Sequence, residues 1–206
     1  MSGAFPISTA KFGTLGIKSN QTTIISKSDS GKKLARQIDN QRWGFTVQII
    51  TAKRSDVYGD LMAFIVKQRG GKENFTIIPP EIEDARGNET GSVLVNGVHA
   101  VGDTTIAMDA FGSDGAGRFK AGDFLKFASH TKVYMVVSDV TSSSNAATVT
   151  IEPPLITALA DDSAVTYDNV PFTVYLTSDV QEFGVSGSDK DGNLYYEYQF
   201  DVEEAL

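Results

Sequence analysis

The sequence predicts a mainly β protein with one α-helix (α+β), in which a split β-sandwich or barrel domain carries an inserted small β-barrel or β-sandwich domain. Three observations support this prediction. Residues 42–50 alternate apolar and polar side chains, which is the two-residue period of a strand with one buried face. Residues 194–202 show the same alternation, so we expect both segments to share one sheet. Between them, short strand-like runs recur at regular spacing.

The first fifty residues contain several candidate β segments. Residues 1–22 are rich in Gly, Ser, Thr and Asn without a lasting period, so we expect an extended arm there. Residues 22–26 and 32–38 read as two strands joined by a turn at 28–31. Together with residues 42–50 they predict an antiparallel meander of about three strands. In the last of these strands the buried face would hold Trp43, Phe45, Val47 and Ile49.

The period changes to that of a helix at about residues 55–69. We expect Ser55 as its N-cap and Gly70 as its C-cap. Gly59 lies within the helix, where glycine costs about 1 kcal/mol, so it suggests a close approach to the sheet. The apolar side of the helix would hold Tyr58, Leu61, Met62, Phe64 and Ile65. Residues 75–78 form a further predicted strand, which ends before two prolines.

Residues 81–165 are predicted to form the inserted domain, and residues 1–80 plus 166–206 the split outer domain. The insert begins after one Pro-Pro pair and contains a second pair near its end, which suggests stiff connections. Its five expected strands are residues 92–95, 104–108, 124–127, 132–137 and 147–151. After the insert, residues 170–177 predict a strand, residues 180–183 a possible second one, and residues 184–193 a long hairpin loop.

Charge is distributed unevenly along the chain. The net charge of −8 argues against nucleic acid as the main partner. Residues 1–80 hold 12 Lys and Arg against 5 Asp and Glu, whereas residues 166–206 hold 1 against 9. Either the two segments lie side by side in one sheet domain, or the basic face of one subunit docks on an acidic face of a neighbour. The sequence leaves both interpretations open.

Residues with catalytic or metal-binding chemistry are scarce. The chain has no cysteine, and we expect its two histidines, His99 and His130, to be surface or loop residues. Residues 189–193 (Asp-Lys-Asp-Gly-Asn) resemble the start of a calcium loop without its closing acid, so a hairpin turn is the better interpretation. No catalytic, cofactor or metal site is predicted. No apolar run approaches the ~18 residues of a membrane span, and residues 1–5 lack a signal pattern. We therefore expect a soluble protein made in a cytoplasm.

Several motifs resemble a known group of viral proteins. Residues 41–43 (Gln-Arg-Trp) open a strand, the helix ends in residues 64–70 (Phe-Ile-Val-Lys-Gln-Arg-Gly), and a strand runs into Pro79 and Pro80. This order resembles the tail and baseplate structural proteins of tailed bacteriophages, the distal tail protein group in particular. Residues 120–127 (Lys-Ala-Gly-Asp-Phe-Leu-Lys-Phe), 132–136 and 151–155 resemble a module common in such proteins.

The resemblance implies a virion subunit that forms a ring at the tail tip, usually a homohexamer. The ring would join the tail tube protein to the baseplate hub or tail-spike proteins, with the insert projecting outward. The polar face of the strand at residue 42 is then the candidate subunit interface, and the candidate residues are Arg36, Arg42, Thr46 and Gln48. The mid-chain insert differs from the simpler layout with a carboxy-terminal galectin-like domain, so the layer of the tail stays open.

Two other functions compete with the ring. A host-surface or glycan-binding module of a phage tail would use aromatic side chains of the insert, of which Phe111, Phe119 and Tyr134 are the few candidates. An enzyme such as a peptidoglycan hydrolase would need a carboxylate pair or a metal site. Asp103, Asp109 and Asp123 provide carboxylates without partner chemistry, so we do not expect an enzyme.

Overall fold

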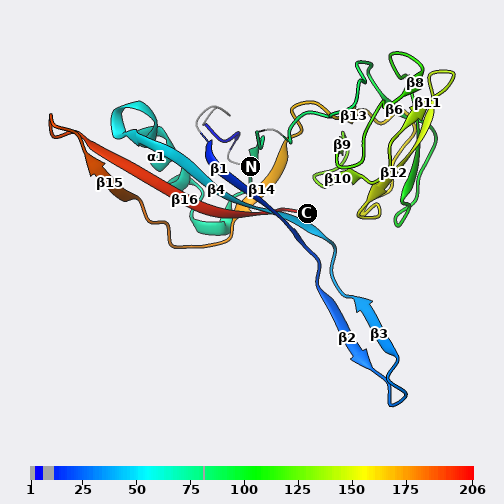
Figure 1. Ribbon diagram of the computed structural model, residues 1–206, viewed down its shortest axis with the longest axis horizontal. Coiled ribbons are helices and arrows are strands. Elements are labelled where there is room, and N and C mark those ends of the chain that lie inside the picture. Colours follow the sequence, from blue (N-terminus) through cyan, green and yellow to red (C-terminus); the bar gives the residue numbers. More distant parts are fainter. Residues whose placement is uncertain (1–2, 7–11, 81) are drawn as a thin grey trace.

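The computed structural model describes residues 3–6, 12–80 and 82–206. In this part of the chain the structure is mainly β with one α-helix, which confirms the predicted fold class. Figure 1 shows an elongated molecule in which the two ends of the chain form one sheet with its helix, and the middle of the chain forms a small β unit beside it. The exact domain bounds, 81 and 165, stay a prediction.

The first sheet has six antiparallel strands in the order β1-β4-β16-β14-β5, with β15 paired to β16. Its strands are β1 (Phe12–Asn20), β4 (Arg42–Lys53), β5 (Phe75–Ile77), β14 (Phe172–Leu176), β15 (Gly184–Ser188) and β16 (Leu194–Glu204). The register of β4 and β16 places Phe45 opposite Val202 and Val47 opposite Phe200. The two alternating segments therefore share one sheet, as predicted.

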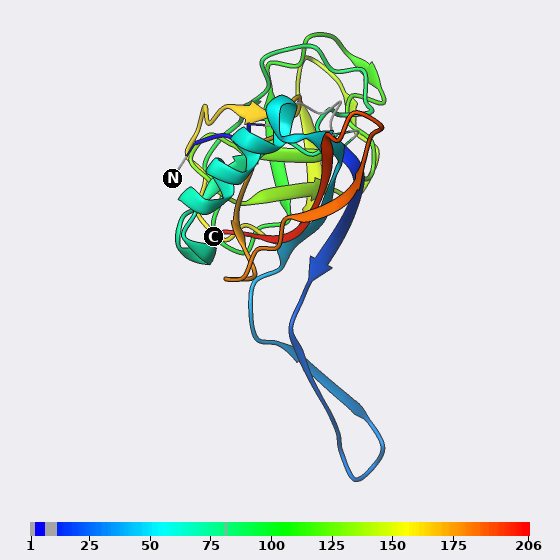
Figure 2. The same ribbon diagram turned by 90° about the vertical axis from the view of Figure 1, so that its left-hand side faces the viewer.

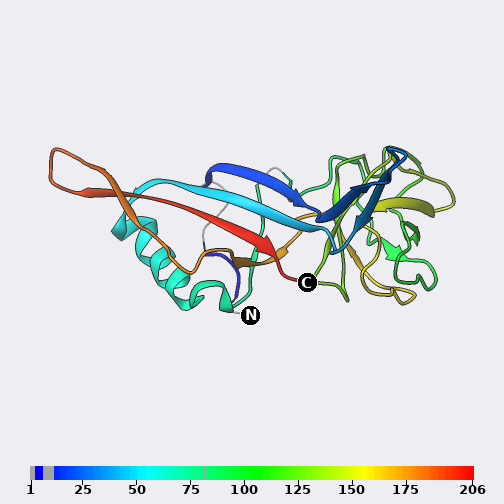
Figure 3. The ribbon, with the colours of Figure 1, turned by 90° about the horizontal axis from the view of Figure 1, so that it is seen from below.

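The helix packs on one face of this sheet and leaves the other face open (Figure 3). A π-helical turn (Arg54–Tyr58) leads into α1 (Gly59–Lys67), which is followed by a 3-10 turn (Gly70–Lys72). The prediction of Ser55 as N-cap is wrong, because α1 begins after Tyr58 without a side-chain cap. Gly59 also approaches no strand. A Cβ there would lie 3.0 Å from the carbonyl oxygen of Arg54, so glycine accommodates the change from π to α geometry.

β2 (Thr23–Lys27) and β3 (Lys33–Gln37) form a separate two-stranded hairpin, which we call the β2–β3 hairpin. Figure 2 shows it extending away from the rest of the molecule. The predicted meander is wrong, because β1 occupies the edge of β4 that β3 would have used. The arm predicted for residues 1–22 is in part this strand β1, whereas residues 1–2 and 7–11 lie outside the described residues.

The small unit contains a second six-stranded sheet in the order β13-β9-β10-β12-β7-β6. An isolated bridge between Leu94 and Ala164 joins its two ends, so the sheet is a nearly closed barrel. Its strands are β6 (Leu94–Val95), β7 (Thr105–Asp109), β9 (Phe124–Phe127), β10 (Val133–Val136), β12 (Ala147–Glu152) and β13 (Val165–Thr166). β8 (Gly115–Ala116) pairs with β11 (Thr141–Ser142) beside it. The sequence did not predict β8, β11 or β13.

Two segments near the end of the chain differ from expectation. Residues 180–183 are not a strand, and the predicted loop at 184–193 begins with strand β15. β15 pairs with the start of β16, and only residues 189–193 form the turn between them. We call β15, this turn and the paired start of β16 (residues 184–197) the β15–β16 arm.

Candidate functional site

The described residues hold no group of three or more His, Asp or Glu side chains placed to bind a metal ion. His99 accepts a hydrogen bond at Nε2 from the backbone N–H of Ala107, at 3.2 Å. His130 lies in the loop between β9 and β10, one of the two expected positions, but it is buried there, with its Nδ1 2.9 Å from the hydroxyl of Tyr134. Both histidines therefore have structural contacts. In the same part of the chain, no helix is long and apolar enough to cross a bilayer.

Residues 189–193 form a hairpin turn, as expected. The carboxylate of Asp189 accepts hydrogen bonds from the backbone N–H groups of Asp191 and Asn193, both at 2.9 Å, and from Nδ2 of Asn193 at 2.8 Å. Lys53 on β4 adds an ion pair at 3.3 Å. These donors, the Asn193 side chain first, lower the pKa of Asp189 to about 2. The carboxylate is thus occupied by the turn and by Lys53.

The aromatic side chains that could have contacted a sugar lie inside the small unit. Phe111, Phe119 and Tyr134 are buried in its core, where Phe119 contacts Phe111 and Tyr167 ring to ring. Burial of these rings stabilises the barrel. They are consequently not available to a ligand at the surface.

The β2–β3 hairpin exposes apolar and basic side chains to solvent. Pairing of Ile24 with Arg36 places these residues on one face together with Leu34, and the opposite face carries Ile25 with Lys27 and Lys33. Ile24 and Leu34 are each more than half exposed. Arg36, one of the four candidate interface residues, thus lies on this hairpin.

The other three candidates lie on the open face of the first sheet. Thr46 donates a hydrogen bond to Asp201 on β16, and Gln48 accepts one from the hydroxyl of Thr14 on β1 at 3.1 Å. Arg42 opens β4 and lies 3.8 Å from Asp39. Because β4 is paired along both edges within its own chain, it can contact a second subunit only through this face. The structure therefore groups Arg42, Thr46 and Gln48 on β4 and places Arg36 elsewhere.

Ion pairs connect the basic head of the chain to its acidic tail. Lys18 on β1 reaches Asp201 on β16 at 3.1 Å, and Lys53 reaches Asp189. These contacts fit the interpretation in which the two segments lie side by side. The cations of the β2–β3 hairpin are different, since none of them forms an ion pair with a described residue. They are Lys27, Lys32, Lys33 and Arg36.

A buried polar cluster joins the small unit to the first sheet, and sequence reasoning missed it. Lys132 and Glu204 are both fully buried, and the ammonium group of Lys132 contacts the carboxylate. Glu204 also accepts from the backbone N–H of Val133 at 2.7 Å and of Trp43 at 3.2 Å. Lys132 donates to Gln41 at 2.8 Å, and Trp43 Nε1 donates to the carbonyl of Val133 at 2.9 Å.

Burial shifts the pKa of both charged groups in this cluster. Removal from water lowers the pKa of Lys132 and raises the pKa of Glu204, while the attraction between the two charges opposes both shifts. Phe124 from the small unit completes the contact, with its ring 5.2 Å from that of Trp43 in an edge-on arrangement. Gln41, Trp43, Lys132 and Glu204 are all buried and satisfy one another's polar groups, so the cluster has the properties of a structural joint.

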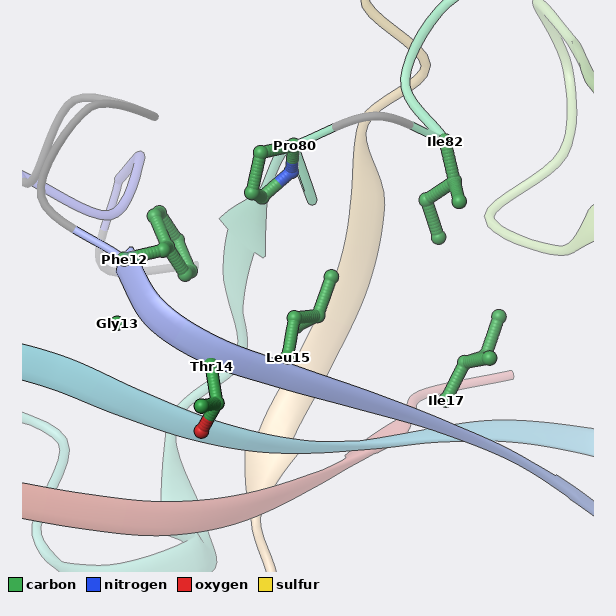
Figure 4. Close-up of a pocket in the computed structure, with 7 residues that line it drawn as sticks. All are labelled: Phe12, Gly13, Thr14, Leu15, Ile17, Pro80 and Ile82. Carbon is green, nitrogen blue, oxygen red and sulfur yellow. The ribbon is translucent and has the colours of Figure 1, made fainter.

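A groove of about 400 Å³ runs beside β1 (Figure 4). In Figure 4 the side chains of Phe12, Leu15 and Ile17 point toward Pro80 and Ile82, whereas Thr14 points to the other face of the sheet. None of the residues that line the groove can titrate between pH 2 and 12. The groove therefore offers apolar contact and no acid-base chemistry.

Comparison with known proteins identifies part of the chain. Residues 83–170 match the family described as "Distal tail protein pb9, B domain". None of the curated proteins compared with the chain matches it. The matched range contains the whole barrel, from β6 to β13. This match supports a structural role in a phage tail. Residues 83–170 are therefore similar to the B domain of distal tail protein pb9, and this match supports the resemblance of the chain to the distal tail protein group of bacteriophages.

Proposed function

We propose that the chain is a structural, non-enzymatic subunit of a tailed-phage tail tip, which self-assembles into a ring of about six copies. The ring would connect the tail tube to the hub or receptor-binding apparatus of the virion. The family match of residues 83–170 supports the tail location. The described residues also lack a metal cluster, and their histidines are engaged in structural contacts.

The β2–β3 hairpin is the observation that carries self-assembly. A two-stranded hairpin that contacts nothing else is marginally stable in water. This one also exposes four large aliphatic side chains, namely Ile24, Ile25, Leu34 and Ile38. Contact with another copy would remove them from water, at about 25 cal/mol for each Å² of apolar surface buried. The hairpin is therefore best explained as part of a subunit interface.

The two sheets would have separate tasks in this ring. We propose that residues 1–80 plus 166–206 form the ring domain, and that residues 81–165 form a domain that projects from it. Arg36 would contact a neighbour through the hairpin. Arg42, Thr46 and Gln48 would contribute through the open face of β4, whose edges are already paired.

Light scattering on the full chain at several concentrations tests this proposal. We expect a discrete multimer of about six subunits. The double variant Ile24→Ser/Leu34→Ser should shift the protein to monomer while circular dichroism shows that it keeps its β structure, because both side chains are exposed in the single chain. Val66→Ser is the matched control, since Val66 is an exposed aliphatic residue on α1. A wild-type chain that stays monomeric at every concentration would contradict self-assembly.

A further inference from the structure

We infer that the β2–β3 hairpin of one copy docks on the β15–β16 arm of the next copy. This inference rests on the proposed self-assembly and names the two surfaces that meet. The two surfaces match in charge, in apolar character and in their free strand edges. Each property comes from a different set of observations, described in turn below.

The hairpin presents the positive surface. Lys27 and Lys33 are cross-strand partners near its tip, Lys32 lies in the adjoining turn, and Arg36 lies further along β3. All four side chains are exposed, and Asp29 in the turn is the one opposing charge among residues 22–38. The hairpin thus places four cations beside its exposed aliphatic side chains.

The β15–β16 arm and the loop before it present the negative surface. Glu182, Glu197 and Asp191 are exposed and form no ion pair with a described residue. Asp189 is held by Lys53, and Lys190 is the only cation within residues 179–197. A groove of about 310 Å³ lies between Glu182 and Glu197. It is lined by Gln48, Glu182, Gly184, Glu197, Tyr198 and Gln199.

The arm region also matches the hairpin in apolar character. Val180 is 72% exposed, Val185 53% and Leu194 47%. Exposed aliphatic side chains beside carboxylates complement exposed aliphatic side chains beside cations, because contact removes apolar surface from water while opposite charges meet at its rim. A patch with this composition on each partner favours one mutual orientation.

Strand edges are free on both surfaces. Among the described strands, β15 pairs only with β16, and β2 and β3 pair only with each other. Each of these strands therefore has one edge whose backbone N–H and C=O groups can pair with a strand of another chain. Addition of the hairpin to the edge of β15 would extend the first sheet across two subunits.

The two surfaces lie at opposite ends of the first sheet (Figures 1 and 3). A contact between the hairpin of one copy and the arm of the next is therefore heterologous, or head to tail. In an open chain of subunits it leaves one hairpin free at one end and one arm free at the other. Such contacts form a ring when the rotation between neighbouring subunits closes, and an open filament when it does not. The geometry agrees with a ring and does not favour a symmetric dimer.

Charge reversal in the full chain tests the inference. The hairpin variant Lys32→Glu/Lys33→Glu and the arm variant Glu182→Lys/Glu197→Lys should each weaken association at least tenfold, as measured by sedimentation and light scattering. The chain that carries all four changes should recover association, because opposite charges again meet. An equimolar mixture of the two variants should also recover it, since each hairpin then meets an arm of opposite charge in alternating order.

Arg54→Glu/Lys120→Glu is the matched control, because it changes the net charge by the same amount at exposed positions outside both surfaces. Circular dichroism checks that each variant keeps its β structure. If the hairpin variant associates as well as the control while the wild type assembles, the inference is wrong and the proposed function stands. Failure of both the four-fold variant and the mixture to recover association also overturns it. A monomeric wild type overturns both.

Discussion

The ammonium group of Lys132 contacts the carboxylate of Glu204, and both side chains are fully buried although 72 positions separate them. Lys132 directly precedes β10 of the barrel, and Glu204 ends β16 of the first sheet. The contact therefore joins the small unit to the sheet built from the two ends of the chain. Backbone N–H groups from both sides, those of Val133 and Trp43, complete the hydrogen bonding of the carboxylate.

Removal of one partner should show the strength of this joint. Lys132→Met leaves Glu204 buried without its cation, so we expect a loss of about 3–5 kcal/mol in the free energy of unfolding. Urea denaturation followed by the fluorescence of Trp43, the only tryptophan of the chain, measures this loss. Lys18→Met is the control, because the exposed pair of Lys18 with Asp201 should contribute less than about 1 kcal/mol. Equal losses in the two variants would refute the role assigned to the buried pair.

Asp123 anchors the segment that leads into the barrel. Its buried carboxylate accepts from the backbone N–H groups of Lys120 at 2.8 Å, Arg86 at 3.0 Å and Gly87 at 3.3 Å. In Asp123→Asn an NH2 group replaces one carboxylate oxygen, and this group would face the backbone N–H donors that the oxygen accepted from. We therefore expect the free energy of unfolding to fall by about 2–3 kcal/mol, measurable by thermal or urea unfolding. Asp139 accepts one bond, from Ala121, and is exposed. Asp139→Asn should therefore cost less than about 1 kcal/mol, and the reverse order would count against this account.

Alternation and helical period predicted the elements whose one face is fully buried. In β4 the residues Trp43, Phe45, Val47 and Ile49 are buried, and the last three pair across to buried residues of β16, so the two patterns identified one sheet. The helix was found for the same reason, since Leu61 and Ile65 face the core. Its start was misjudged because a π-helical turn has no sequence period that distinguishes it from an α-helix. The prediction of Gly70 as C-cap is also wrong, because α1 ends at Lys67 with Gln68 as its C-cap, and Gly70 begins a separate 3-10 turn.

β1 was missed for a specific physical reason. A register shift between Phe12 and Thr14 breaks the two-residue period, so Phe12, Leu15 and Ile17 share a face although their spacing is uneven (Figure 4). Because β1 was not predicted, β3 was expected to pair with the edge of β4 that β1 occupies, and this led to the wrong prediction of a meander. The strands β8, β11 and β13 have two residues each, which is too short for alternation to be visible.

The sequence predicted those parts of the candidate site that follow from strand alternation and from the distribution of charge along the chain. The sequence indicated a polar face on β4 and a basic head, which the structure places on the open side of the sheet and on the β2–β3 hairpin. It gave no sign of the contact of Lys132 with Glu204, because a lone lysine and a lone glutamate are expected at the surface. Only the topology brings them together.

Gly87 should be intolerant of any side chain. A Cβ at this position would lie 1.9 Å from the carbonyl oxygen of Arg118, a backbone atom that cannot move aside cheaply. We expect Gly87→Ala to lower the free energy of unfolding by about 1–3 kcal/mol through forced backbone shifts. Gly187→Ala is the control, because nothing lies within 4 Å of its added Cβ. Differential scanning calorimetry compares the two, and unchanged melting of Gly87→Ala would contradict the close approach.

The fragment of residues 83–170 should fold alone, since its core is made of its own residues. Val95, Tyr134 and Ile151 are among the buried side chains of a cluster that lies wholly within this range. Excision exposes Phe124, Val133 and Lys132, so the fragment should melt at a lower temperature than the same unit in the full chain. Circular dichroism during heating measures both. A fragment without a cooperative transition would contradict the division into an inserted and an outer domain.

Acid should weaken the turn of the β15–β16 arm as the pH falls from 3.8 toward 2, because the turn holds the carboxylate of Asp189 in its charged form. Folding lowers the pKa of Asp189 from 3.8 to about 2, so between these values the folded chain binds fewer protons than the unfolded chain. The contribution of this carboxylate to stability is therefore fully present above pH 3.8 and is lost as the pH falls toward 2. The carbon-13 chemical shift of the Asp189 carboxyl group during an acid titration reports the folded pKa directly.

The variant Asn193→Ala tests the cause of this low pKa. It removes the side-chain donor, which is the largest cause of the lowered pKa, so the titration midpoint of Asp189 should move up toward 3.8. Lys190→Ala serves as the control within the same turn, because Lys190 makes no ion pair with a described residue, and it should leave the midpoint near 2. A midpoint near 3.8 in the wild type would mean that the turn does not hold the carboxylate as the structure describes.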